Sequence, residues 1–211
     1  MHWIDPACLP ETNGTVTQFL MNPHGELDGF ILDGQWQVHF PPHLSERIGA
    51  HITLGENVSV RGVKPRTADI VAAVSIEAAN GGLIVDEGPH GDHHKHEHEA
   101  PDVERHAAEV AGTIALSLFG PKGELRGALL SDGISLRVEP HAAVELDTYL
   151  MPGARVCAWG EMIETGLART LDVSEIAYED EDEPAGALTD NGEADDAALD
   201  APADAGVRAN G

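Results

Sequence analysis

The amino-acid sequence predicts an all-β protein made of two tandem copies of one small unit, each with three strands, a short helix and two further strands. Three observations support this prediction. Residues 14–67 match residues 112–165 at a constant offset of 98 positions, without a gap. Apolar residues alternate with polar ones over short stretches that Gly and Pro separate. Helical periodicity occurs at the same place in both copies, after the third strand.

The residues that the two copies share are mostly turn and core residues. They include Gly14, Pro23, Gly25, Gly29, Pro42, His43, Gly55 and Gly62, each repeated 98 positions later. Residues of this kind fix the path of the backbone, and glycine in particular allows turns that other residues resist. The two halves are therefore expected to share a fold rather than a reactive constellation of side chains.

In the first copy, strands are expected at residues 14–21, 27–33 and 36–40, with a turn at residues 22–25 between the first two. The pair Pro41–Pro42 then ends the sheet pattern. Apolar residues follow in both copies at i, i+4 and i+8, the spacing of one helix face: Leu44, Ile48 and Ile52, then Ala142, Leu146 and Leu150. A glycine ends each helix, and two strands complete each copy, at residues 57–62 and 70–76 and at residues 155–160 and 170–176.

This order of elements resembles that of the OB-fold family, a five-stranded barrel with a helix between strands three and four. The resemblance implies two barrels, at residues 1–85 and 110–178. It also implies a ligand surface on strands two and three of each barrel, flanked by the loops that join strands one to two and four to five. Members of the family commonly bind single-stranded nucleic acid, oligosaccharide or protein there, so the resemblance implies a binding module.

Two further segments lack the pattern of a folded unit. Residues 86–109 combine acidic residues with a histidine tract, and we expect them to form a flexible linker. Residues 179–211 are an acidic run rich in Ala, Asp and Gly, in which Arg208 is the only base. Low hydrophobicity with charge of one sign cannot offset the entropy cost of ordering, so a disordered acidic tail is expected.

The charge and the cysteine content limit the function. The chain has 37 acidic and 12 basic residues and a formal net charge of −25. Such a charge disfavours bulk attraction to DNA, RNA or anionic membranes. Two cysteines cannot form a disulfide framework, and no apolar segment has the length of a membrane helix or the form of a secretory signal. We therefore expect a cytoplasmic protein without a membrane partner.

Four residues on the predicted ligand surface are candidates for contact with single-stranded nucleic acid. Binding of a single strand needs aromatic faces for stacking and cations for the phosphates. Trp36 and Phe40 share the parity of Val38 on the third strand, which places them inside the barrel. If Leu27 and Ile31 point inward on the second strand, as do Leu125 and Leu129 in the second copy, the outward residues that could contact a ligand are Phe30, His39, Arg126 and Arg137.

The loop between strands four and five of the first copy is the most basic segment of the chain. Residues 61–67 contain Arg61, Lys64 and Arg66, at a position that OB-folds often use for binding. The equivalent residues 159–165 have no base and contain two acids. Two interpretations of the three cations remain open: contact with phosphates, or solvated charges that balance an acidic domain.

The expected linker contains a tract of closely spaced histidines: His90, His93, His94, His96 and His98. Neutral imidazoles bind borderline divalent metals such as Zn and Ni. Histidine-rich linkers also occur as simple soluble spacers, and no cysteine lies nearby to complete a site. The tract thus leaves two interpretations, a divalent-metal site or a spacer, and the predicted fold itself requires no cofactor.

No catalytic signature occurs in the sequence: it has no phosphate-binding loop, no nucleophile elbow and no zinc-protease motif. We therefore expect a non-catalytic binding module rather than an enzyme. The first hypothesis is weak binding of single-stranded nucleic acid, regulated by competition from the acidic tail. The alternatives are a protein-interaction adaptor that uses the barrel faces, and a divalent-metal protein that uses the histidine tract.

Overall fold

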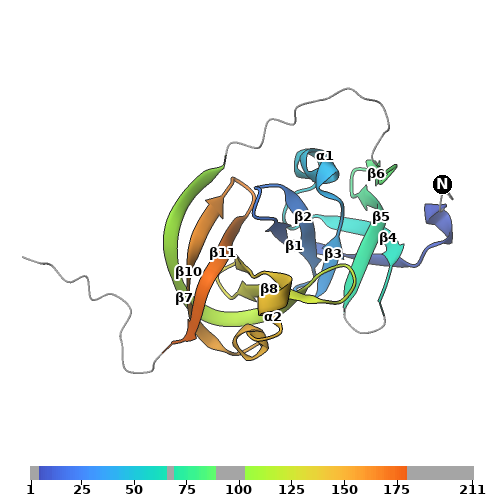
Figure 1. Cartoon of the computed structure of the whole chain (residues 1–211). Helices are drawn as coiled ribbons and strands as arrows, with labels where there is room; N and C mark the ends of the chain where they lie inside the picture. Colours follow the sequence, from blue (N-terminus) through green and yellow to red (C-terminus); the bar gives the residue numbers. More distant parts are fainter. Residues whose placement is uncertain (1–4, 66–68, 89–102, 180–211) are drawn as a thin grey trace, which may run out of the picture. The chain divides into compact units, whose positions relative to one another are not determined.

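The computed structural model describes residues 5–65, 69–88 and 103–179, and strands make up most of it. Figure 1 shows the strands and short helices coloured along the chain. The strands form two closed barrels that belong to one unit ending at Glu179. No helix in the described ranges is long and apolar enough to cross a membrane.

The first barrel is formed by five strands, and a sixth strand extends its sheet. The strands are β1 (Glu11–Met21), β2 (Leu27–Leu32), β3 (Trp36–His39), β4 (Asn57–Val63), β5 (Ile70–Ala78) and β6 (Leu83–Val85). Their order is β3-β2-β1-β4-β5-β6, and a parallel pairing of β3 with β5 closes the barrel. Three short helices accompany them: η1 (Pro6–Cys8) before β1, then η2 (Pro42–Leu44) and α1 (Ser45–His51) between β3 and β4.

The second barrel repeats this connectivity. Its strands are β7 (Glu104–Phe119), β8 (Leu125–Leu130), β9 (Ile134–Arg137), β10 (Arg155–Glu164) and β11 (Arg169–Tyr178). They close in the order β10-β11-β9-β8-β7, and β9 and β11 form the parallel pair. The short helices α2 (Pro140–Ala143) and η3 (Asp147–Leu150) lie between β9 and β10. Both units therefore have the OB-type order, and the predicted all-β tandem pair is confirmed.

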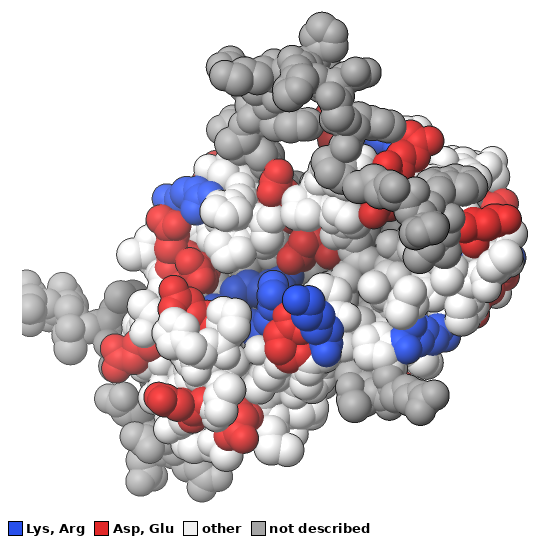
Figure 2. Space-filling view, turned by 45° about the vertical axis from the view of Figure 1, so that its right-hand side comes forward, with Lys and Arg blue, Asp and Glu red and all other residues white. Residues whose placement is uncertain are grey.

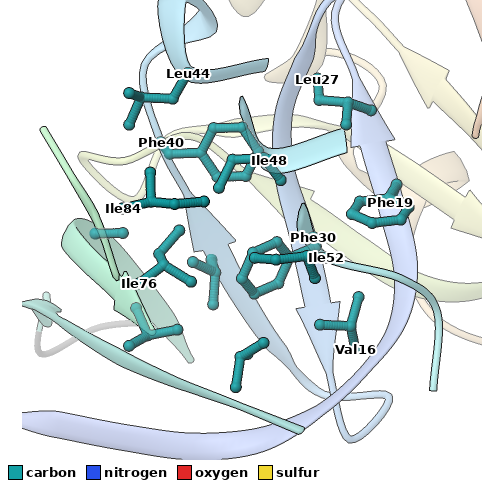
Figure 3. Close-up of a cluster of buried hydrophobic side chains, with 14 of the residues drawn as sticks. Val16, Phe19, Leu27, Phe30, Phe40, Leu44, Ile48, Ile52, Ile76 and Ile84 are labelled. Atoms are coloured by element: carbon teal, nitrogen blue, oxygen red, sulfur yellow. The ribbon is translucent and has the colours of Figure 1, made fainter. Parts of the chain in front are cut away.

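Each barrel has an apolar core, which is the physical basis of the alternation in the sequence, and the core of the first barrel also includes Ile163 and Ala168 of the second. In the first barrel, Phe30 and Phe40 lie with their ring centres 5.8 Å apart and pack with Ile48 of α1 (Figure 3). Leu44, Ile48 and Ile52 are all buried, which confirms the predicted apolar face of the helix region. Burial of one such side chain contributes roughly 1.5–3 kcal/mol, so the short helix α1 is stabilised by the barrel rather than by its own hydrogen bonds.

Two boundaries differ from the sequence prediction. β7 begins at Glu104, inside the segment expected to be linker, because residues 104–113 pair with β10 along their whole length. Residues 104–109 therefore belong to the second barrel. The helix region of the second copy is divided into two short helices instead of one, and Ala143 and Leu150 supply its buried positions. The remaining predicted linker, from residue 89 to 102, and the tail from residue 180 lie outside the described residues.

Glycines at one repeated position allow both barrels to close. Each lies at a register shift in the pairing of strands four and five of its barrel. A Cβ atom on Gly62 would overlap the carbonyl oxygen of Ala72, and one on Gly160 would overlap that of Asp172. The repeated glycine is thus explained by the close approach of two backbones.

Replacement Gly160→Ala is expected to lower the free energy of unfolding by roughly 1–3 kcal/mol, because the added methyl group must displace the main chain of β11. The control is Gly166→Ala, since a Cβ atom at Gly166 meets nothing within 4 Å. Urea denaturation followed by circular dichroism measures both variants. Equal stability of the two variants would contradict the role assigned to Gly160.

Candidate nucleic-acid interface

The two barrels contact each other through the surfaces that were predicted to bind a ligand. Leu20 and Ile31 of the first barrel form one buried cluster with Leu118 of the second, and Leu116 and Leu129 pack against it. Leu20 and Ile31 occupy the same repeat positions as Leu118 and Leu129. This cluster and the polar groups around it are termed the inter-barrel contact. It covers part of the predicted ligand surface of both barrels.

Hydrogen bonds surround the apolar cluster of the inter-barrel contact. The Gln37 side chain on β3 is buried; its Nε2 donates to the Ser117 carbonyl oxygen at 2.8 Å, and its Oε1 accepts from the Phe119 N–H at 2.8 Å. The Gln18 Nε2 on β1 donates to the Gly133 carbonyl oxygen at 3.2 Å. A side-chain amide that bonds the main chain of the other barrel through both its nitrogen and its oxygen fixes the register of the two surfaces.

One ion pair crosses the inter-barrel contact. Arg137 Nη2 on β9 lies 2.7 Å from Asp28 Oδ1 on β2, and the two side chains are 8% and 19% exposed, respectively. Because the pair is largely removed from water, loss of one partner leaves the other charge without compensation. Arg137, a predicted phosphate contact, is therefore occupied by a carboxylate of the same chain.

His39, at the end of β3, is buried against the second barrel with 8% of its surface exposed. Burial lowers the pKa of His39, Asp28 acts in the opposite direction, and the Arg137 and Arg126 guanidinium groups lower the pKa further. Its Nε2 atom is buried without a hydrogen-bond partner. Within the described part of the chain, Arg137 Nε and Ser135 Oγ on β9 are also buried and unpartnered.

Phe30 is not a surface residue, so its prediction as a ligand contact is wrong. Its side chain is fully buried in the core of the first barrel. The pairing of β1 with β2 shifts between Leu20 and Met21, which leaves Asp28 as one extra residue on β2. This bulge reverses the alternation along the strand. Phe30 consequently points inward, and Ile31, which was expected inside, contacts the second barrel.

The inter-barrel contact brings together three of the predicted ligand residues, His39, Arg126 and Arg137. His39 and Arg137 point out of their own barrels as predicted, but the opposite barrel buries each of them. Arg126 on β8 stays more accessible, with 43% of its side chain exposed, and its Nη2 lies 2.9 Å from Glu124 Oε1. The three residues thus form a mixed cluster with Asp28 and Glu124 rather than an open basic surface.

One cation of the predicted basic loop, Lys64, lies at the opposite end of β3. Lys64 Nζ is 4.4 Å from the centre of the Trp36 ring, which is a cation–π contact. Arg61 lies elsewhere: it is opposite Ser75 of β5, beyond the residue of β5 that pairs with His39, and it forms an ion pair with Glu11. Trp36 begins β3 and His39 ends it, so the Lys64–Trp36 contact and His39 are separated by a strand length of about 10 Å.

Two predicted sites fall wholly or partly outside the described residues. Arg66 of the basic loop lies outside them. The whole histidine tract also lies outside them: His90, His93, His94, His96 and His98. In residues 5–65, 69–88 and 103–179, no group of three or more His, Cys, Asp or Glu side chains could hold a metal ion. Metal binding by the histidine tract therefore stays a prediction.

Cys157 on β10 carries a thiol to which the sequence assigned no role. Burial raises the pKa of Cys157 to about 11, together with Glu109, whose Oε1 lies 3.2 Å from the Sγ atom. At neutral pH this thiol is protonated and a poor nucleophile. The surroundings of Cys157 therefore do not activate its thiol as a nucleophile.

Carboxylates accompany the cations of the protein. In Figure 2, several Lys and Arg side chains gather in a hollow near the middle of the view, with acidic side chains beside them. Five arginines among the described residues form ion pairs with carboxylates: Arg61, Arg105, Arg126, Arg137 and Arg155. A phosphate chain that binds these guanidinium groups must therefore compete with carboxylates of the protein itself.

Comparisons with known proteins give a distant structural similarity. No protein-family model and no curated protein matches the sequence. Among solved structures, the wild-type single-stranded DNA binding protein from Thermus aquaticus is 16% identical, with a TM-score of 0.27, over 84% of this chain and 94% of that chain. A deletion mutant of the same protein is 16% identical, with a TM-score of 0.26, over 83% of this chain and 95% of that chain. TM-scores this low describe a partial superposition and assign no function to this chain.

Replacement Asp28→Asn is expected to lower the free energy of unfolding by about 2–3 kcal/mol, because it leaves the buried Arg137 guanidinium without a carboxylate. The matched control is Glu161→Gln, which breaks the more exposed pair with Arg105 and should cost less than about 1 kcal/mol. Urea unfolding of the full chain gives both values. If the two substitutions cost the same, the Arg137–Asp28 pair does not stabilise the inter-barrel contact.

Proposed function

We propose that the chain is a non-catalytic OB-fold module that binds single-stranded nucleic acid weakly, at the edge of the first barrel beside the start of β3. The observation that supports this proposal most directly is the cation–π contact between Lys64 and Trp36. An aromatic ring and a cation at one place are the two groups that single-strand binding uses. The part of strands two and three that the inter-barrel contact covers is not the proposed site.

The geometry around Trp36 suits a base and a phosphate at neighbouring positions. Trp36 is half-buried and packs on the core of the first barrel, so its exposed part has a fixed orientation. A base stacked on such a ring gains roughly 1–3 kcal/mol. Lys64 carries its ammonium group on a flexible stem, which can turn from the ring to a phosphate.

Three features make the proposed binding weak. The formal net charge of −25 repels phosphates at long range. Arg61, which lies on β4 before Lys64, is already paired with Glu11. Residues 179–211 contain eleven carboxylates on the same chain, and a tethered polyanion competes with nucleic acid at high effective concentration.

Fluorescence anisotropy with a labelled oligothymidine tests the proposal. A chain truncated after Glu179 retains the ion pair between Arg155 and Glu179 and lacks the rest of the competing tail. It is expected to bind several-fold more tightly than the full chain at low salt. The gain should shrink at physiological ionic strength, where the Debye length is about 8 Å.

In the truncated chain, Lys64→Gln is expected to weaken binding by roughly three- to tenfold, because it removes one phosphate contact. The matched control is Lys122→Gln, which removes an exposed lysine from the turn between β7 and β8 of the second barrel. An equal effect of both substitutions would contradict the proposed site. Absence of low-salt binding by the truncated chain would contradict the nucleic-acid function itself and favour a protein partner, which a pull-down with and without nuclease would identify.

A further inference from the structure

His39 is a titratable side chain enclosed within the inter-barrel contact. It projects from the end of β3 and is nearly removed from solvent. The groups that act on it come from four strands: Asp28 on β2, Arg126 on β8, Arg137 on β9 and the Phe119 main chain on β7. Two of the three charged groups are cations of the opposite barrel. A positive charge on His39 would therefore lie beside two arginines.

The repeat explains why this position is unfavourable for a positive charge. At the offset of 98 positions, His39 is equivalent to Arg137, and Asp28 is equivalent to Arg126. Arg137 and Asp28 form an ion pair across the contact. Exchange of the two barrels converts the pair of Arg137 with Asp28 into a pair of His39 with Arg126. Protonation of the His39 imidazole would place two positive charges there instead of an ion pair.

The hydrogen bonding of the closed contact is incomplete at the same place. His39 Nε2 and Arg137 Nε are both buried without a partner. A buried polar atom without a partner destabilises the state that buries it, because water would satisfy that atom in the open state. The closed contact is therefore already disfavoured at this point before any charge is added.

We propose that His39 is a pH-dependent latch between the two barrels: the contact is closed while the imidazole is neutral, and protonation of the imidazole opens it. Opening uncovers the strand surfaces of both barrels, including Gln37 and Arg137, which the closed contact buries. The latch is a property of the contact itself, and it does not depend on the proposed nucleic-acid ligand.

The direction of the pH dependence follows from the surroundings of His39. In the closed contact, burial and the two guanidinium groups keep the pKa of His39 below its usual range, although Asp28 and a hydrogen bond to the Phe119 main chain oppose them. In an open state the imidazole meets water and has its ordinary pKa of about 6.5. The open state therefore binds the proton more readily. Closure is fully favoured above about pH 6.5 and loses stability as the pH falls below that value toward the lower pKa of the closed state.

Amide hydrogen exchange of the full chain, measured by NMR, tests the latch. The Phe119 N–H donates to Gln37 Oε1 across the contact, so its exchange reports opening. Its protection factor, corrected for the intrinsic pH dependence of exchange, is expected to fall about five- to tenfold between about pH 7.5 and 5.5. The Ile114 N–H, which donates to the Ala154 carbonyl oxygen within the second barrel, should keep its protection.

Neutral substitutions separate His39 from the other histidines of the chain. His39→Gln is expected to abolish the pH dependence at Phe119, and His39→Asn provides a second neutral variant. His43→Gln, at a more exposed histidine of the same barrel, should keep the wild-type response. The latch is overturned if Phe119 protection does not fall in the wild type, or if it falls equally in the neutral variants. It is also overturned if Ile114 loses protection in parallel, because the barrel itself is then unfolding.

Discussion

The contact between equivalent surfaces of the two barrels determines which parts of the molecule are free to bind. Leu20 and Ile31 meet Leu118 and Leu129 because the repeat places an apolar pair at the same positions of both barrels. Two copies of one surface that contact each other resemble the isologous interface of a twofold dimer, here within a single chain. Each barrel therefore covers part of the other's predicted ligand surface, and the surface at Trp36 stays outside this contact.

The fold can be predicted from the sequence because its signals are local. Alternation, turn glycines and the break at Pro42 depend on neighbours along the chain, and the repeat presents each signal twice, with Pro140 at the position of Pro42. The inter-barrel contact is not local. Alternation on β3 correctly places Gln37 and His39 outside the first barrel, but it carries no information about what lies against them. The bond between Gln37 and Phe119 joins residues 82 positions apart, which no periodicity reports.

The error at Phe30 has a different physical cause. Counting with a period of two assumes an unbroken strand, and the bulge at Asp28 adds one residue to β2. Gly29 is a signal of this irregularity, because a Cβ atom there would overlap the Val38 carbonyl oxygen. The second copy offers another signal, since the residue equivalent to Phe30 is Ala128, which has no ring to stack on a base. Both Phe30 and Ala128 are fully buried.

The covered strand surfaces and the ion pairs both reduce the number of cations that are free to meet a ligand. Arg137 faces Asp28 and Arg126 is held by Glu124, so local carboxylates neutralise both cations of the ligand surface on the second barrel. The ordinary pKa values of carboxyl and guanidinium groups lie outside the range from about 5 to 8, so side chains of these types do not ordinarily titrate in that range. An imidazole does respond there. His39 is therefore the residue of this cluster through which a change of pH can alter the balance between contacting and separated barrels.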